Sequence, residues 1–310
     1  MPEIRRRIKK EIQQHNVNLD VTNECYGMQR RILNYDQQTC WLNASLQLLL
    51  CGMDYIANIQ MNSMLGMELN ILHGQHFINP TDLKNMLQEE IDRSSERLER
   101  QNILHGQQCA RDLLLILSEN KENWLDVYHM FHHVTVQTLR CPNCKKETYY
   151  RSSDLFRELS CPPDKSRLRS YIEQTFACSE EVDFTCEGCQ KKGLFKKSLK
   201  LCYEESSKFI IFVITRGISD AINNYNNQVV VTDNCIIEDE ENNQHTYEPI
   251  AVIEHEGRFT SSRKSQGHYV CDVKNFEDNL WYNTNDETVP KLISRQQITR
   301  YGYVILYRRI

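Results

Sequence analysis

The stretch Asn34-Tyr-Asp-Gln-Gln-Thr-Cys40-Trp-Leu-Asn-Ala-Ser-Leu-Gln-Leu-Leu-Leu50 places a cysteine where a polar turn gives way to apolar residues. No Gly or Pro interrupts the run from Trp41 to Leu50, so we expect a buried helix with Cys40 in its first turn. The positive end of a helix dipole and its free N–H groups favour the thiolate, which is the nucleophilic form of cysteine. The alternative is an inert core cysteine, because unpaired cysteines are among the most buried residues.

A histidine suited to activate this cysteine lies near the far end of the chain. Gly267-His268-Tyr269 opens a strand-like run, and Asn285 and Asp286 follow it. In thiol proteases an early cysteine is the nucleophile, a late histidine takes its proton, and a following Asn or Asp orients the imidazole. The order Cys40, His268, then Asn285 or Asp286 fits this pattern. With ten His and 13 Cys in the chain, the order alone is a weak signal.

Two Cys-x-x-Cys pairs are the strongest local signals in the sequence. They are Cys141 with Cys144, and Cys186 with Cys189. Each pair on a tight turn directs two sulfurs to one point, and two such turns give a tetrahedral four-sulfur site for structural Zn²⁺. The interval between the pairs exceeds that of a compact zinc ribbon, so we expect the turns to cap an extended strand pair. A redox role is disfavoured because the βαβ setting of redox Cys-x-x-Cys motifs is missing.

Composition and charge narrow the class of protein. The 310 residues are 40% hydrophobic and 25% charged, which is typical of one large globular domain or two. A net charge of −5 argues against a general nucleic-acid binder, and the longest apolar runs, such as 209–214, are too short to span a membrane. The basic N-terminus, with Arg5-Arg6-Arg7, lacks the apolar core of a secretory signal. It is a solvated helix face or a nuclear-import patch.

The cysteine content and the missing signal together indicate a reducing compartment, so we expect a cytosolic or nuclear protein. Hydrophobic periodicity predicts helices up to about residue 119, then strands around the cysteine pairs, then a sheet. The run 208–216 should be a central strand buried on both faces. Other expected elements are helices at 81–91, 108–117 and 168–176, a strand at 153–159, and antiparallel strands of one sheet at 229–232, 247–254, 268–273, 280–283 and 303–307. The order indicates an α+β fold.

Four sequence blocks occur in a fixed order along the chain. They are Thr39–Gln47, Gln107–Leu114, the two cysteine pairs, and a late block made of His255–Gly257, Gly267–Tyr269 and Trp281–Asp286. At these blocks the chain resembles the ubiquitin-specific protease family of deubiquitinases, from about residue 25 to the C-terminus. The first block is similar to the family's cysteine box, the second to its Gln-Gln-Asp-Ala-x-Glu-Phe-Leu block, and the last to its His box.

The resemblance implies a papain-like α+β fold with a thumb (about 25–130), zinc-binding fingers (about 135–202) and a palm (about 203–310). A polar, basic extension would occupy residues 1–24. The implied reaction is hydrolysis of the isopeptide bond at the C-terminal glycine of ubiquitin through a Cys40 thioester. His268 would act as base and then acid, with Asn285 as the first choice of orienting residue and Asp286 as the second. Ubiquitin or ubiquitylated proteins would be the partners of a monomeric enzyme.

Further roles follow from the same resemblance. Asn34, one residue earlier than the family's asparagine, would supply the oxyanion hole, with Gln37 or Gln38 as replacements. Gly267 and Tyr269 would line the channel for a Gly-Gly tail. Asp112 is a candidate contact for the basic ubiquitin tail, whereas Cys109 stands where the family has an acidic residue.

Two other functions stay open at this stage. A protease for a ubiquitin-like modifier such as SUMO would use the same catalytic set, and Trp41 stands where the family more often has Tyr or Phe. A weakly active or inactive ubiquitin-binding relative is the other, because the turn before Cys40 differs from the family pattern.

Overall fold

The computed structural model describes residues 30–34, 38–56, 59, 61–93, 108–119, 121–177, 180–215, 227–231, 233–257, 267–294 and 301–310. The predictions for the extension 1–24, the Arg5–Arg7 patch and Gln37 lie outside the described residues. Among the described residues, no helix combines the length and the apolar character needed to cross a membrane.

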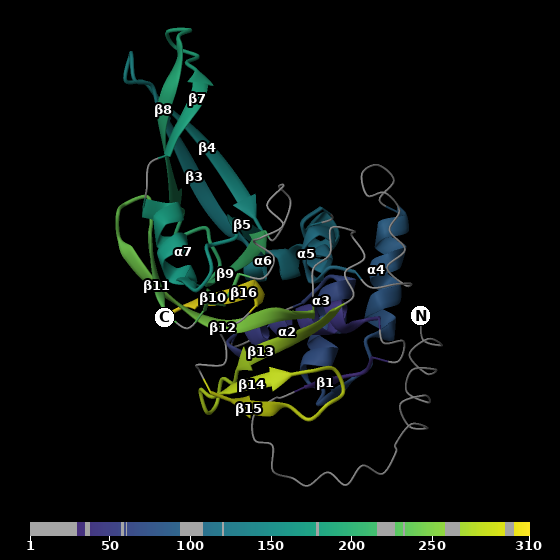
Figure 1. The fold of residues 1–310 in the computed structure, drawn as a ribbon. Helices are drawn as coiled ribbons and strands as arrows, with labels where there is room; N and C mark the ends of the chain where they lie inside the picture. Colours follow the sequence, from purple (N-terminus) through teal and green to yellow (C-terminus); the bar gives the residue numbers. More distant parts are fainter. Residues whose placement is uncertain are drawn as a thin grey trace, which may run out of the picture.

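The thumb is helical, as its periodicity predicts (Figure 1). It consists of α2 (Cys40–Asp54), α3 (Met64–His73), α4 (Thr81–Arg93), α5 (Ala110–Glu119), a 3₁₀ turn (Lys121–Asn123) and α6 (Leu125–Phe131). Two short strands, β1 (Arg31–Ile32) and β2 (Phe77–Ile78), pair in parallel beside these helices. Helix α2 is buried from Cys40 to Met53, because apolar residues occupy every side of it.

The palm is an eight-stranded sheet. Its strand order is β15 (Lys291–Ile293), β14 (Trp281–Thr284), β13 (Gly267–Lys274), β12 (Gln244–Gly257), β16 (Gly302–Arg309), β9 (Phe209–Thr215) and β5 (Phe156–Ser160), with β11 (Cys235–Glu238) also on β12. All pairs are antiparallel except β5 with β9. Strand β9 is buried from Phe209 to Ile214, which confirms the predicted central strand.

One predicted palm strand is wrong. The segment 229–232 contributes only β10 (Val229–Val230), which pairs in parallel with β6 (Ser166–Arg167) in a separate two-stranded sheet. Both edges of β9 are already occupied, by β16 and β5, so the segment that follows β9 has no open edge there.

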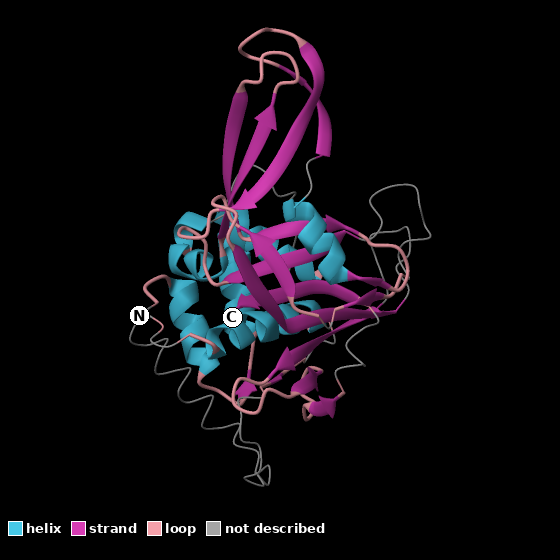
Figure 2. Ribbon diagram, turned by 90° about the vertical axis from the view of Figure 1, so that its left-hand side faces the viewer, coloured by secondary structure: helices cyan, strands magenta, loops and turns pink. Residues whose placement is uncertain are grey.

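The fingers are a separate four-stranded antiparallel sheet that projects from the body (Figures 1 and 2). Its order is β4 (Glu147–Asp154), β3 (His133–Arg140), β8 (Lys192–Leu201) and β7 (Glu180–Thr185). Each cysteine pair therefore closes its own hairpin, where a single strand pair was predicted. Within the range 135–202, β5 and α7 (Leu168–Ala177) belong to the body instead, because β5 pairs with β9 and α7 packs on β11.

The helices of the thumb cover one face of the palm sheet (Figures 1 and 2). Helix α2 packs on β12, β13 and β16 and shares one apolar core with them, including Trp41, Leu46, Ile253 and Leu306. A second core with α7 fills the opposite face. This packing brings the first turn of α2 to the beginning of β13, so that residues 228 positions apart in sequence can meet.

Candidate active site

Cys40 is the first residue of α2 and only 1% exposed. Thr39, the residue before the helix, forms no side-chain cap hydrogen bond to the described first turn. Its carbonyl instead accepts the N–H of Asn43 at 2.9 Å, as the helix requires. The first N–H groups of α2 therefore point toward the end of the helix at which the Cys40 sulfur lies.

His268 is the second residue of β13 and lies opposite Glu256 on β12. Its hydrogen bond with Cys40 raises the pKa of the imidazole to about 9, against the opposing effect of partial burial. The Nε2 atom of His268 lies 2.8 Å from Oδ1 of Asn285 and 3.8 Å from Oδ2 of Asp286. The structure thus brings together the cysteine, the histidine and both predicted orienting residues, with Asn285 at hydrogen-bonding distance.

Asp286 links the palm to the segment before α2. Its two carboxylate oxygens accept hydrogen bonds from Asn34 Nδ2 and Asn43 Nδ2, each at 2.7 Å. Its backbone carbonyl accepts the N–H of Ile32 at 3.0 Å, and its φ of 46° lies in the left-handed region. Aspartate tolerates this region better than most residues, and these bonds hold it there.

Asn34 is fixed at both ends of its amide. Its Oδ1 accepts from the backbone N–H and the hydroxyl of Thr39, at 3.1 Å and 2.7 Å, while its Nδ2 donates to Asp286. A reversed amide would face the Asp286 carboxylate with oxygen, so the network admits one orientation. One N–H of Asn34 is thereby committed. Its role as an oxyanion donor stays a prediction for the other N–H, and Gln38, the described alternative, is exposed.

Gly267 packs against a buried histidine. A Cβ at this position would lie 2.2 Å from Cε1 and Nε2 of His255, so only glycine fits there. Tyr269 contacts the same ring edge-on, with the ring centroids 4.7 Å apart, and is 5% exposed. The geometry gives Gly267 and Tyr269 packing roles that set the course of β13. The contact of Gly267 and Tyr269 with a substrate tail stays a prediction.

Asp112 and Cys109 lie at the beginning of α5. Asp112 Oδ2 accepts the backbone N–H of Cys109 at 2.9 Å, and burial raises the pKa of this carboxyl. The Cys109 sulfur lies 2.7 Å from the hydroxyl of Tyr303 on β16, so it joins thumb and palm. Asp112 therefore caps the start of its helix, and its contact with a substrate tail stays a prediction.

Four cysteines at the finger tip form a candidate metal site. The sulfurs of Cys141, Cys144, Cys186 and Cys189 lie within 4.8 Å of one another. The Sγ–Sγ distance is 3.8 Å from Cys141 to Cys189 and 3.6 Å from Cys144 to Cys186. Tetrahedral Zn²⁺ with Zn–S bonds near ~2.3 Å requires sulfurs about 3.8 Å apart, so the cluster fits the ion.

The two cysteine turns also share their backbone geometry. Lys145 and Gln190, each directly after a second cysteine, have φ of 62° and 57°. Each donates its N–H to the carbonyl of the first cysteine of its pair, at 3.1 Å and 2.8 Å. The turns are thus a matched pair facing one point, as the spacing predicted.

Fold and site together define the class of protein. A helical thumb, fingers that carry a four-cysteine cluster, and a palm sheet, with Cys40 and His268 meeting where thumb and palm join, place the chain in the papain-like thiol hydrolase fold class. The family model described as ubiquitin carboxyl-terminal hydrolase matches residues 33–307, so the chain belongs to this family.

Individual relatives agree with this membership. Ubiquitin carboxyl-terminal hydrolase 48 of Danio rerio is 27% identical over 174 residues, which are 52% of this chain and 15% of that protein. The chain thus spans a small part of the length of this curated relative. A solved structure, the SAGA DUB module of Ubp8, Sgf11, Sus1 and Sgf73 bound to monoubiquitin, matches 100% of this chain and 76% of the matched chain, with a TM-score of 0.66 and 15% identity. At this identity the match establishes a shared fold.

Sequence reasoning did not single out Asn43. It is a polar residue one turn after Cys40 in a predominantly apolar helix, and it is only 2% exposed. A polar side chain in a run that is buried on all sides needs a partner, and this signal was visible in the sequence. The identity of the partner, Asp286, was not.

Proposed function

We propose that this protein is a deubiquitinating cysteine protease that cleaves the bond at the C-terminal glycine of ubiquitin. The observation that carries the proposal is the contact of Cys40 with an imidazole that Asn285 orients, in a chain of the ubiquitin carboxyl-terminal hydrolase family. The solved relative with monoubiquitin bound supports ubiquitin as the partner. The reducing compartment, cytosol or nucleus, is part of the same proposal.

The reaction begins with a protonated imidazole, since the pKa of His268, about 9, keeps its proton on at neutral pH. The nucleophile is the thiolate form of Cys40. The Cys40 sulfur attacks the carbonyl carbon of the glycine, and the carbonyl electron pair moves onto oxygen. The first-turn N–H groups of α2, and the second N–H of Asn34, are the donors available to this oxyanion.

Collapse of this intermediate breaks the carbon–nitrogen bond. The lysine amine leaves with the proton of His268, and ubiquitin remains as a thioester on Cys40. His268 then takes a proton from water, which attacks the thioester. Ubiquitin is released as its carboxylate, the second proton of the water passes to solvent, and Cys40 and His268 return to their starting state. Asn285 accepts a hydrogen bond from Nε2 throughout, so Nδ1 stays directed at sulfur.

We assign a structural Zn²⁺ to the four finger cysteines. Bound there, the ion would cross-link the β3–β4 and β7–β8 hairpins. It would supply no group to the reaction, which takes place at the junction of thumb and palm.

Activity-based probes test the proposal. Ubiquitin and SUMO, each with an electrophile in place of the terminal carboxylate, are incubated with wild type, Cys40→Ala and His268→Ala. Cys51→Ala is a matched control, because Cys51 is a buried cysteine on the same helix. The expected result is a ubiquitin adduct that needs Cys40, weakens in His268→Ala and persists in Cys51→Ala.

Two outcomes contradict the proposal. An adduct with SUMO alone keeps the mechanism and assigns another modifier. The absence of any adduct, together with measurable ubiquitin binding, makes the protein a binding module.

A further inference from the structure

We propose that Asn43 is a positioning residue of the active site, which acts through the Asp286 carboxylate to hold the helix carrying Cys40 against the loop after β14, whose Asn285 orients His268. The inference rests on the proposed function for its kinetic readout. Its geometric content concerns only how Cys40 and His268 are held together.

Asn43 joins its own helix to two other segments, of which one is distant in sequence. Its Nδ2 donates to Asp286 Oδ1 at 2.7 Å and to the Leu33 carbonyl at 3.1 Å, so both N–H groups of the amide are used. The first bond reaches the loop after β14 and the second reaches the segment before the Cys40 turn. Because Asn43 lies one helical turn after Cys40, its side chain fixes the end of α2 that presents the sulfur.

Asp286 needs both of its amide donors. The carboxylate is 9% exposed and lies 3.8 Å from Nε2 of His268. A buried carboxylate that lost a donor would be drawn to the nearest positive group, which here is the imidazole. That movement would compete with Asn285, which accepts from the same Nε2 at 2.8 Å. By holding Asp286 on the thumb side, Asn43 and Asn34 leave Asn285 as the orienting group.

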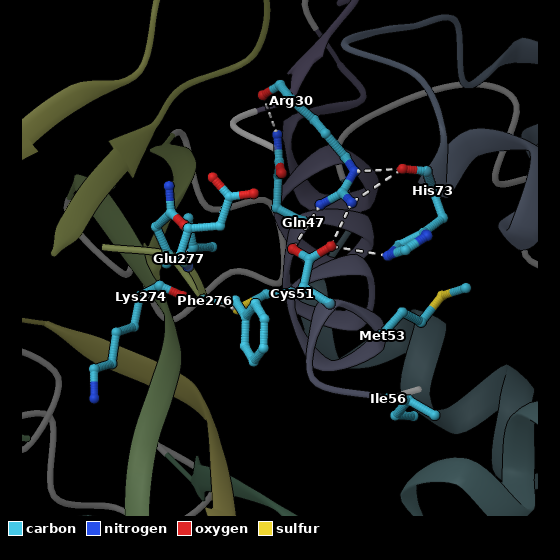
Figure 3. A pocket seen from close by; sticks show the side chains of 12 residues that line it. Arg30, Gln47, Cys51, Met53, Ile56, His73, Lys274, Phe276 and Glu277 are labelled. Atoms are coloured by element: carbon cyan, nitrogen blue, oxygen red, sulfur yellow. Dashed lines mark hydrogen bonds and ion pairs between the residues drawn. The ribbon is translucent and has the colours of Figure 1, made fainter. Parts of the chain in front are cut away.

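The chain offers a matched control on the same helix. Gln47 lies one turn beyond Asn43, is similarly buried, and donates its Nε2 to the Arg30 carbonyl at 2.6 Å. Figure 3 shows this bond, at the edge of a cavity of about 110 Å³ that also contains the Arg30–Asp54 ion pair. Removing the donor at Gln47 therefore disturbs α2 by one buried hydrogen bond without touching Asp286.

The test compares two isosteric variants, Asn43→Asp and Gln47→Glu, each of which replaces a donating amide with a carboxylate. Asp at 43 faces Asp286 with like charge, whereas Glu at 47 loses the bond to the Arg30 carbonyl beside the cavity that the Arg30–Asp54 ion pair lines, away from Asp286. The swap Asn43→Asp with Asp286→Asn restores one donor and one acceptor to the pair. Alanine at each position repeats the comparison without added charge, should Asn43→Asp not fold.

The first readout is independent of ubiquitin. The alkylation rate of Cys40 by iodoacetamide is followed from pH 5 to 9 by mass spectrometry of the Cys40 peptide, because the pairing of Cys40 with His268 sustains alkylation at acid pH. The second readout is kcat and KM on a ubiquitin–fluorophore substrate, and thermal unfolding is measured alongside.

In Asn43→Asp we expect alkylation at pH 6 and kcat to fall about tenfold or more, with KM changed less than about twofold. Gln47→Glu should lower the unfolding temperature about as much as Asn43→Asp does. It should leave the alkylation rate and kcat within about threefold of wild type. The swapped pair should recover at least part of the loss.

Equal effects in the two variants, or no recovery in the swapped pair, would overturn the positioning role. If wild type shows Cys40 alkylation with this dependence on Asn43 but no ubiquitin hydrolysis, the positioning role stands and the proposed function fails.

Discussion

His268 and Asn285 are joined by a hydrogen bond of 2.8 Å between Nε2 and Oδ1. The amide oxygen can only accept, so Nε2 carries the proton and Nδ1 is the ring nitrogen available to Cys40. Neighbouring Asp286 lies 3.8 Å from the same Nε2 and adds negative charge without replacing the bond. The imidazole is thus oriented by a neutral amide and stabilised in its charged form by a carboxylate.

This arrangement predicts an alkaline limit of activity. Cys40, Asn285 and Asp286 all favour the charged imidazole and keep its pKa near about 9, so the rate should fall above that pH as His268 loses its proton. Asn285→Asp adds a negative charge and should move the limb to higher pH, while Asn285→Ala should move it lower and reduce kcat about tenfold. The measurement is kcat/KM from pH 5 to 10. Limbs that coincide in all three proteins would contradict this assignment.

The contact between Gly267 and His255 predicts a strong effect of a single methyl group. In Gly267→Ala the new Cβ would overlap the His255 ring, so β13 must shift and move His268, the next residue. We expect kcat to fall at least tenfold, with a loss of stability of about 1–3 kcal/mol. Gly193→Ala is the control, because its nearest side-chain atom, in Pro142, would be 3.5 Å away. Removal of the clash in Gly267→Ala with His255→Ala should restore part of the activity.

Zinc removal should separate the fingers from the catalytic groups. Metal analysis of the purified protein should give about one zinc per chain, and Cys144→Ser should lose it, whereas Cys161→Ser, outside the cluster, should keep it. The finger sheet has its own small core, with Leu139 and Phe195. Loss of the zinc should therefore leave Cys40 alkylation unchanged. Hydrolysis of ubiquitin substrates should decline. Loss of alkylation on chelation would show that the fingers also hold the active site.

His133 predicts a loss of stability in acid. It is fully buried at the base of the fingers, and its ring nitrogens have no hydrogen-bond partner among the described residues. Burial lowers its pKa from 6.5 to about 4. Between these two pH values the unfolded chain binds a proton at His133, whereas His133 in the folded protein stays neutral. Stability is therefore complete above pH 6.5 and should fall by about 2 kcal/mol by pH 5. Urea unfolding of His133→Leu should show a flatter pH dependence than wild type.

Asp272 predicts the opposite trend. It is buried on β13, accepts a hydrogen bond from Asn283 Nδ2 at 2.7 Å, and burial raises its pKa from 3.8 to about 6. The folded protein then binds the proton more tightly, so this residue's contribution to stability is lost as pH rises from 4 to 6. Asp272→Asn keeps an acceptor for Asn283 and should stabilise the fold by about 3 kcal/mol at pH 7.5. Unchanged urea midpoints at that pH would contradict the burial cost.

The elements and the four-cysteine cluster were predictable because local patterns set them. The apolar run after Cys40 specifies a helix buried on all sides, and the run 209–214 specifies a strand with neighbours on both edges. The Cys-x-x-Cys spacing specifies two turns that present their sulfurs to one point. The misplacement of 229–232 shows the limit of such patterns, because whether a sheet edge is open depends on strands elsewhere in the chain.

The sequence by itself singled out Cys40, His268 and the four finger cysteines as candidates, because thiol, imidazole and four-sulfur motifs are defined by residue type and short spacing. Only the tertiary structure decided how they divide their roles: Asn285 bonds to His268, while Asp286 bonds to Asn34 and Asn43. Asn34 and Asn43 lie more than 240 positions from Asp286 in sequence, and the packing of α2 on the palm sheet brings them together. No local spacing encodes that distance, because it depends on how a whole helix and a whole sheet fill one core.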